Sequence, residues 1–244
     1  MNFIPFFQPI LMVLPGKKPE IYGYEALLRG PENTHFEAPD VVFQKARLLG
    51  RLQEIDLLAF TMSCRTFAAN DPGGKLFVNL FPETLLSETF SPTNINRFLK
   101  SIGLSPSRVV IEINEAHAEP KVLAKRVEEI TRDGIQLALD DFGSGHSDMN
   151  RWIELNPAYL KCDQNLIKGV CQNPRRMQAI KSVEMMCQGG SLLIAEGVET
   201  QEDLDCLTQN TDIRLFQGFH LGYPAPLSVE QQNFGLNEGK RCSA

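Results

Sequence analysis

Acidic and amide side chains recur at the carboxyl ends of short apolar runs, where a strand buried on both faces would normally carry none. The residues in question are Glu25, Asn79, Glu112, Asp140, Asp141 and Glu196, and Lys161 and Gln217 occupy the same kind of position. Oxygen ligands suit hard divalent cations such as Mg²⁺ or Mn²⁺, and adjacent aspartates can hold two ions. The pattern therefore indicates a metal-assisted hydrolase.

Each of these residues also has an ordinary structural explanation when it is taken alone. A glutamate in a strand can face solvent or form an ion pair, and Asp140 and Asp141 can form a turn or cap a helix. Lysine is most often a surface residue. The recurrence on successive strands argues against chance, but an anion-binding barrel without chemistry stays a comparable alternative at this point.

The elements that must position these side chains are short, β-branched runs separated by helical patterns. The expected strands are Phe6–Val13, Ile21–Leu28, Lys75–Leu80, Arg108–Ile113, Gln136–Leu139, Ala158–Lys161, Ser191–Ala195 and Ile213–Phe216. Eight strands is the number that a closed α/β barrel needs. Only a short segment around Pro15 and Gly16 separates the first two, so they are expected to form an antiparallel hairpin.

Helices are expected where apolar residues recur at steps of three and four. These segments are Pro39–Leu49, Leu52–Ala69, Thr93–Ile102, Lys121–Arg132, Arg175–Cys187 and Leu204–Leu207. Thr200, followed three residues later by Asp203, predicts an N-cap ahead of the last of them. The alternation carries no repeat or linker and predicts one domain.

Composition excludes several classes of protein. Of the 244 residues, 43% are hydrophobic and 22% are charged, which is typical of a globular domain. The net charge of −6 argues against a general nucleic-acid or membrane-surface binder. Neither a membrane span nor a signal peptide is indicated, and the six cysteines form no C-x-x-C pair. A cytoplasmic protein with reduced thiols is therefore expected.

Several short blocks also match a known family in order along the chain. After the opening Phe6–Ile10, they are Tyr24–Arg29, Val78–Pro82, Ile111–Glu115, Leu139–Gly145, Leu160–Asp163, Ala195–Thr200 and Gln217–Phe219. From about residue 4 to residue 227, the sequence resembles the EAL-domain cyclic-di-GMP phosphodiesterases of bacterial second-messenger signalling. Any single block would be weak evidence, whereas seven collinear blocks are specific.

The resemblance implies a fold and a reaction. The fold class is α/β, a TIM-like (β/α)8 barrel with one antiparallel strand. A single EAL-type domain would span residues 1–244, with its core at about 4–230 and a frayed tail at 231–244. The implied reaction is hydrolysis of cyclic di-GMP to linear pGpG by metal-activated water, with two ions of Mg²⁺ or Mn²⁺ in each site.

The resemblance also implies a role for each site residue. One metal would be held by Glu25, Asn79, Glu112 and Asp140, and the second by Asp140, Asp141 and Glu196. Lys161 would orient the attacking water and Glu196 is the candidate general base. Glu115 would brace the loop Asp141–Met149, and Asp163, Glu199, Gln217 and Ser144 would support the site. Gln8 and Arg29, together with Gln217, would bind the nucleotide.

Some positions depart from the family pattern. In the loop after Asp141, Ser144 keeps a hydroxyl, but His146 and Asp148 replace the usual Tyr and Ser. Gly30, Phe81 and Gln164 replace a common aromatic, Ser and Arg, and the first of these changes could weaken a guanine contact. None of them removes an expected metal ligand, so an active enzyme is favoured.

Two other functions stay open. One is a catalytically silent cyclic-di-GMP receptor or protein-interaction module of the same fold, and the other is a metal phosphoesterase with a different substrate. The resemblance further implies a homodimer that forms near the loop Asp141–Met149. Control of the activity is expected to come from expression, from dimerisation or from a regulatory protein partner.

Overall fold

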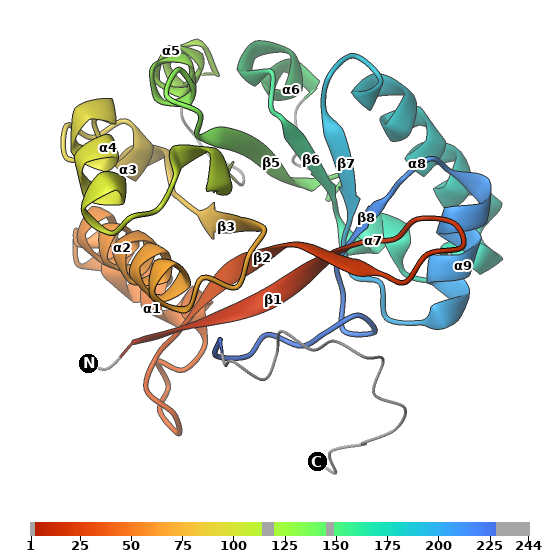
Figure 1. Cartoon of the computed structure of the whole chain (residues 1–244), viewed down its shortest axis with the longest axis horizontal. Coiled ribbons are helices and arrows are strands. Elements are labelled where there is room, and N and C mark those ends of the chain that lie inside the picture. The colour runs from red at the N-terminus through yellow and green to blue at the C-terminus, as the bar shows by residue number, and fades with distance from the viewer. Residues whose placement is uncertain (1–2, 114–119, 145–148, 228–244) are drawn as a thin grey trace.

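Eight strands close into a barrel in the computed structural model, which describes residues 3–113, 120–144 and 149–227 (Figure 1). The strands are β1 (Ile4–Met12), β2 (Glu20–Arg29), β3 (Lys75–Asn79), β4 (Val109–Ile113), β5 (Gln136–Phe142), β6 (Tyr159–Cys162), β7 (Leu192–Ala195) and β8 (Leu215–Phe216). β1 runs antiparallel to both of its neighbours, β2 and β8, and every other pair is parallel. The predicted TIM-like barrel with one antiparallel strand is confirmed.

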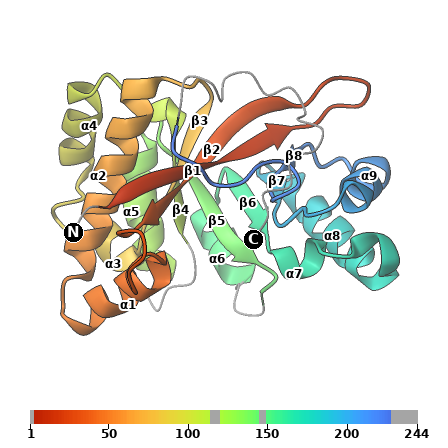
Figure 2. The same ribbon diagram turned by 90° about the horizontal axis from the view of Figure 1, so that it is seen from below.

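Helices surround this barrel. They are α1 (Pro39–Leu48), α2 (Leu52–Asn70), α3 (Pro82–Leu85), α4 (Pro92–Ser101), α5 (Pro120–Thr131), α6 (Met149–Leu155), α7 (Gln164–Ile167), α8 (Pro174–Cys187) and α9 (Gln201–Asn210), with single 3₁₀ turns η1 (Pro106–Arg108) and η2 (Val170–Gln172). Figure 2 shows α1, α2 and α4 gathered at one end of the molecule and α7, α8 and α9 at the other. Among the described residues, no helix is both long and apolar enough to cross a bilayer.

The helices expected from apolar spacing are all present, although their ends differ by a few residues. Thr200 is the N-cap of α9, where its side chain accepts a hydrogen bond from the backbone N of Asp203 at 3.1 Å. The short helices α3, α6 and α7 were not expected, and β5 extends through Asp140 and Asp141 to Phe142. The expected domain bounds reach into residues 228–244, outside the described residues.

The core has two layers, as a barrel requires. Outward-facing strand residues such as Val78, Ile111 and Leu160 belong to the cluster that packs against the helices. A separate inner cluster takes one residue from each of seven strands: Ile10, Phe77, Val110, Ala138, Tyr159, Ile194 and Leu215. Because successive strand residues face opposite sides, the side chains two residues further along each strand must also point into the barrel.

Candidate active site

The polar residues singled out in the sequence lie one layer above the apolar inner cluster. On the parallel strands, Asn79, Glu112, Asp140, Lys161, Glu196 and Gln217 each follow an inner-cluster residue by two positions. On the antiparallel β1 the order is reversed, so Gln8 precedes Ile10 by two positions, and Gln8 pairs in register with Glu25 of β2. One barrel mouth therefore collects side chains from all eight strands or their ends.

Lys161 lies at the centre of this layer and is only 1% exposed. Its Nζ lies 2.7 Å from Glu196 Oε1, 2.8 Å from Glu112 Oε1, 3.2 Å from Asp140 Oδ1 and 3.4 Å from Glu25 Oε2. These four carboxylates share one ammonium. If all of them are ionised, the cluster carries an excess of negative charge, and burying that charge has a large desolvation free energy.

The pKa values respond to this crowding. Burial opposes the charge on Lys161, but the carboxylates of Asp140, Glu112, Glu196 and Glu25 raise its pKa well above the ordinary value. Burial and the surrounding carboxylates raise the pKa of Glu112 and of Glu196, against the attraction of Lys161. Burial acts on Glu25 too, yet Lys161 and the Gln217 and Asn79 amides lower its pKa overall.

A β-bulge lets two adjacent aspartates serve the same mouth. The pairing of β5 with β6 shifts register between Leu139 and Phe142, and Asp141 adopts a left-handed backbone with φ 55°. In a regular strand, Asp140 and Asp141 would face opposite sides. Here oxygens of Asp140, Asp141 and Glu196 all lie within 4.8 Å of one another.

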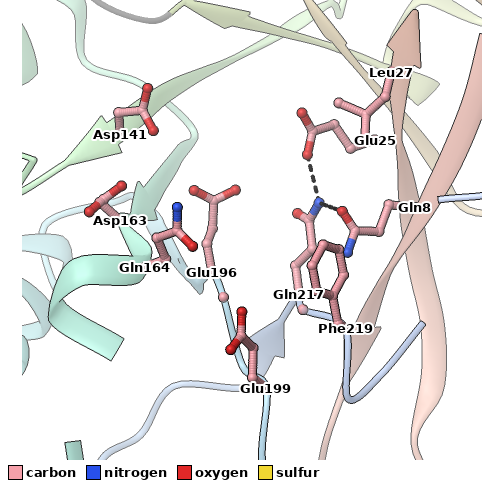
Figure 3. A pocket seen from close by; sticks show the side chains of 12 residues that line it. Gln8, Glu25, Leu27, Asp141, Asp163, Gln164, Glu196, Glu199, Gln217 and Phe219 are labelled. Carbon is pink, nitrogen blue, oxygen red and sulfur yellow. Dashed lines mark hydrogen bonds between the residues drawn. The ribbon is translucent and has the colours of Figure 1, made fainter. Parts of the chain in front are cut away.

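An amide chain fixes Glu25 on the opposite side of the mouth. Gln217 Nε2 donates to Glu25 Oε2 at 2.6 Å and to Gln8 Oε1 at 3.1 Å, as Figure 3 shows. Asn79 Nδ2 donates to the other Glu25 oxygen at 2.9 Å, and Gln8 Nε2 donates to the carbonyl of Gly222 at 3.1 Å. The amides of Gln217 and Asn79 thereby hold Glu25 in one orientation.

A cavity of about 200 Å³ opens beside these groups. Figure 3 shows Asp141, Asp163 and Glu196 on one side and Glu25, Gln8 and Gln217 on the other. The remaining lining residues are Leu27, Gln164, Gly197, Glu199, Gly218 and Phe219. The sequence alone assigns no role to Leu27, Gln164 or Phe219. All three fall within or beside the motif blocks, and that adjacency is the signal in the sequence that points to them.

Two expected supporting residues lie at the rim and are anchored there. Asp163 is the N-cap of α7, and its Oδ1 accepts a hydrogen bond from Asn165 N at 2.8 Å. Glu199 forms a 2.8 Å ion pair with Lys168. Both carboxylates line the cavity, so these contacts hold acidic groups at its edge.

Other expected site residues stand further from the cavity or cannot be placed. Arg29 covers the Phe6 ring at 5.7 Å and donates to the carbonyl of Leu28 at 3.3 Å, and it is not among the cavity-lining residues. The Ser144 backbone N donates to the carbonyl of Asp141 at 3.1 Å. Glu115, His146 and Asp148 lie outside the described residues.

The donor set fits a hard divalent cation. Among the described residues, no hydrogen bond reaches Oε2 of the fully buried Glu112. Glu112 Oε1 and Asp140 Oδ1 lie near the Lys161 ammonium, at 2.8 and 3.2 Å from its Nζ. Buried carboxylate oxygens without donors carry a large desolvation cost. A cation with oxygen preference would satisfy them, and the cluster of Asp140, Asp141 and Glu196 offers a second group of ligands.

The family model described as the EAL domain matches residues 1–224 of this chain. The chain belongs to the EAL domain family. Among curated relatives, the probable cyclic di-GMP phosphodiesterase PdeA of Escherichia coli K12 is 30% identical over 67% of this chain. This EAL domain spans only 22% of that relative's length.

Solved structures of other EAL proteins share the fold. A c-di-GMP-bound form of a standalone versatile EAL protein from Vibrio cholerae O395 superposes with a TM-score of 0.81 at 25% identity, covering 92% of both chains. A manganese/cy-diGMP complex of Klebsiella pneumoniae BlrP1 gives a TM-score of 0.79 at 28% identity, over 92% of this chain and 56% of that one. The EAL domain described here is therefore similar over most of its length to proteins whose complexes contain the nucleotide.

Proposed function

We propose that the chain is a metal-dependent phosphodiesterase that hydrolyses cyclic di-GMP to linear pGpG. The observation that carries the proposal is the ring of four carboxylates around Lys161 at the mouth of an EAL-family barrel. The full set of expected acids is present, whereas loss of such an acid would favour the silent receptor. The named relatives and complexes support the choice of cyclic di-GMP as substrate.

The proposed cation ligands follow from the fit of the donor set. Glu25, Asn79, Glu112 and Asp140 would hold one ion of Mg²⁺ or Mn²⁺, and Asp140, Asp141 and Glu196 the second. When bound, the ions would reverse the charge of the acidic mouth for an anionic substrate and lower the pKa of bound water. Gln217 and Asn79 orient Glu25 for this purpose, through the hydrogen bonds described above.

The chain's own side chains would then transfer the proton and bind the substrate. Glu196 would accept a proton from the attacking water, because its carboxylate lies at the mouth beside Lys161 and Asp140. The water oxygen bonds to phosphorus while the bond to the 3′ oxygen breaks. That oxygen takes up a proton, so one water is added overall and pGpG is the product. Lys161 orients the water, and Gln8, Gln217 and Arg29 bind the nucleotide.

A turnover assay tests the proposal directly. The purified chain is incubated with cyclic di-GMP and Mn²⁺ or Mg²⁺, with and without a chelator, and the products are separated by chromatography. We expect pGpG only in the reactions that contain metal and no chelator. Binding of cyclic di-GMP without pGpG would instead identify a silent receptor, and equal cleavage of unrelated diesters would identify a general phosphoesterase.

We also propose that the chain forms a homodimer through α5 and α6. These helices pack side by side and expose Val122, Met149 and Ile153, which are 51%, 50% and 60% exposed. Exposed apolar side chains on two neighbouring helices can mark an interface. Sedimentation should give a dimer at micromolar protein and a monomer for Ile153→Asp. A cytoplasmic location and a regulatory protein partner are further inferences, to be checked by fractionation and by co-purification.

A further inference from the structure

Two cysteines far apart in the sequence meet where η2 packs on α9. Asp203 accepts hydrogen bonds from the backbone N of Gly169 at 3.1 Å and from that of Cys171 at 3.5 Å. Cys206 lies three residues after Asp203 on α9 and so shares its helix face. Cys206 is the largest cause of the raised pKa of the Cys171 thiol, which indicates that the two side chains lie next to each other at this contact. The packing therefore brings the two sulfurs together without any cross-link between them.

This pair differs from the other described cysteines in accessibility. Cys171 is exposed and Cys206 is half-buried, whereas Cys64, Cys162 and Cys187 are buried. The contact with Cys206 raises the pKa of Cys171 to about 11, so the thiol is protonated at neutral pH. Thiol–disulfide exchange needs the thiolate. The pair should therefore react slowly near neutrality and faster in alkaline solution.

We propose that Cys171 and Cys206 form a redox modification site, which a disulfide oxidant such as glutathione disulfide converts to an intramolecular disulfide. The thiolate of the exposed Cys171 attacks one glutathione sulfur, which forms a mixed disulfide and releases one glutathione. Cys206 then attacks the Cys171 sulfur and releases the second glutathione. The two cysteines lose two protons and two electrons, and the oxidant gains the two electrons.

The cross-link would tie together the segments that follow two active-site strands. η2 follows β6, which carries Lys161, and α9 follows β7, whose end carries Glu196. The same junction is already bridged by the Lys168–Glu199 ion pair and by Asp203. Since the native structure already holds the two thiols together, the disulfide mainly restricts the unfolded chain. We expect the oxidised protein to be more stable, with a Tm higher by roughly 5–10 °C.

The test uses the full chain carrying Cys242→Ser, which removes the cysteine outside the described residues. This protein and its Cys171→Ser and Cys206→Ser derivatives are incubated with glutathione disulfide at about pH 9, where the thiolate fraction is larger. Free thiols are then alkylated, and peptides are mapped without reduction. We expect a Cys171–Cys206 linked peptide and the rise in Tm only in the protein with both cysteines, and reversal by dithiothreitol.

Three results would overturn the proposal. They are persistent free thiols at both positions under excess oxidant, pairing of either cysteine with another partner, and a linked peptide that leaves the Tm unchanged. Because the readouts are peptide mass and melting temperature, they do not depend on the phosphodiesterase assignment.

Discussion

Lys161 Nζ and Glu196 Oε1 lie 2.7 Å apart in a site where the lysine is almost fully buried and the glutamate side chain is 16% exposed. The same ammonium contacts Glu25, Glu112 and Asp140. When no metal is bound, the Lys161 ammonium is the main positive charge that neutralises the four carboxylates. The position of Lys161 thus links the stability of the barrel mouth to the proposed cation sites.

Replacing Lys161 by Met should expose that link. A buried ion cluster that loses one partner is destabilised by about 3 kcal/mol. We expect the free energy of unfolding of Lys161→Met to fall by this order in EDTA, and Mn²⁺ to restore more stability to the variant than to the wild type. Urea unfolding with and without Mn²⁺ measures both effects.

The matched control is Lys168→Met, which removes a half-exposed lysine paired only at the rim. Surface ion pairs of this kind are worth about 0–1 kcal/mol. If Lys161→Met were as stable in EDTA as this control, the ammonium would not be the balancing charge.

Glu196→Gln tests the proposed base. A glutamine keeps the size of the side chain but cannot accept the proton from water. We expect kcat for cyclic di-GMP to fall by about 10²–10⁴, the usual contribution of a general base, and to stay low at saturating Mn²⁺. Glu199→Gln, at the rim of the same cavity, should lose less than about tenfold by the same principle. A Glu196→Gln enzyme with kcat near that of Glu199→Gln would remove Glu196 from this role.

Much of this arrangement could be predicted from the sequence, for a simple reason. Strand side chains alternate, so a polar residue two positions after a buried apolar one, such as Glu112 after Val110, must enter the barrel with it. The short segment around Pro15 likewise permits only a hairpin. Both inferences use nearest-neighbour geometry, which a sequence displays directly.

Features that depend on longer-range packing were out of reach. The helices α3 and α7 have four residues each, which is too short to show a helical period. The bulge that turns both Asp140 and Asp141 toward the mouth arises from the pairing of β5 with β6, and the sequence placed both residues after the strand. The meeting of Cys171 with Cys206 depends in the same way on how η2 packs against α9.

Gln217→Leu tests whether the amide chain serves the metal or the substrate. The substitution removes the 2.6 Å hydrogen bond that orients Glu25. Loss of a partner that orients a metal ligand typically costs 10–100-fold in metal affinity. We therefore expect the Mn²⁺ concentration for half-maximal activity to rise by about 10–100-fold, with KM for cyclic di-GMP changed less, when both are measured by titration. A rise confined to KM would assign Gln217 to the nucleotide alone.

The buried Asp56 lies away from the active site and should make the free energy of unfolding depend on pH. It is 1% exposed on α2, and its Oδ2 accepts a hydrogen bond from Phe81 N at 2.9 Å. Burial raises the pKa of Asp56 to about 7, well above the ordinary aspartate value of about 3.9. Between these two values the folded protein binds the proton and the unfolded chain does not, so the stability contributed by Asp56 is present at low pH and is lost as the pH rises toward 7.

Asp56→Asn should remove this dependence, because an amide stays neutral and its oxygen can still accept from Phe81. We expect the variant to gain roughly 2 kcal/mol of unfolding free energy relative to the wild type between about pH 5 and pH 8. Asp40→Asn, an exposed neighbour in the first turn of α1, should follow the wild type across the same range. Urea unfolding of the three proteins at both pH values measures the difference, and parallel curves for wild type and Asp56→Asn would show that Asp56 ionises normally in the folded chain.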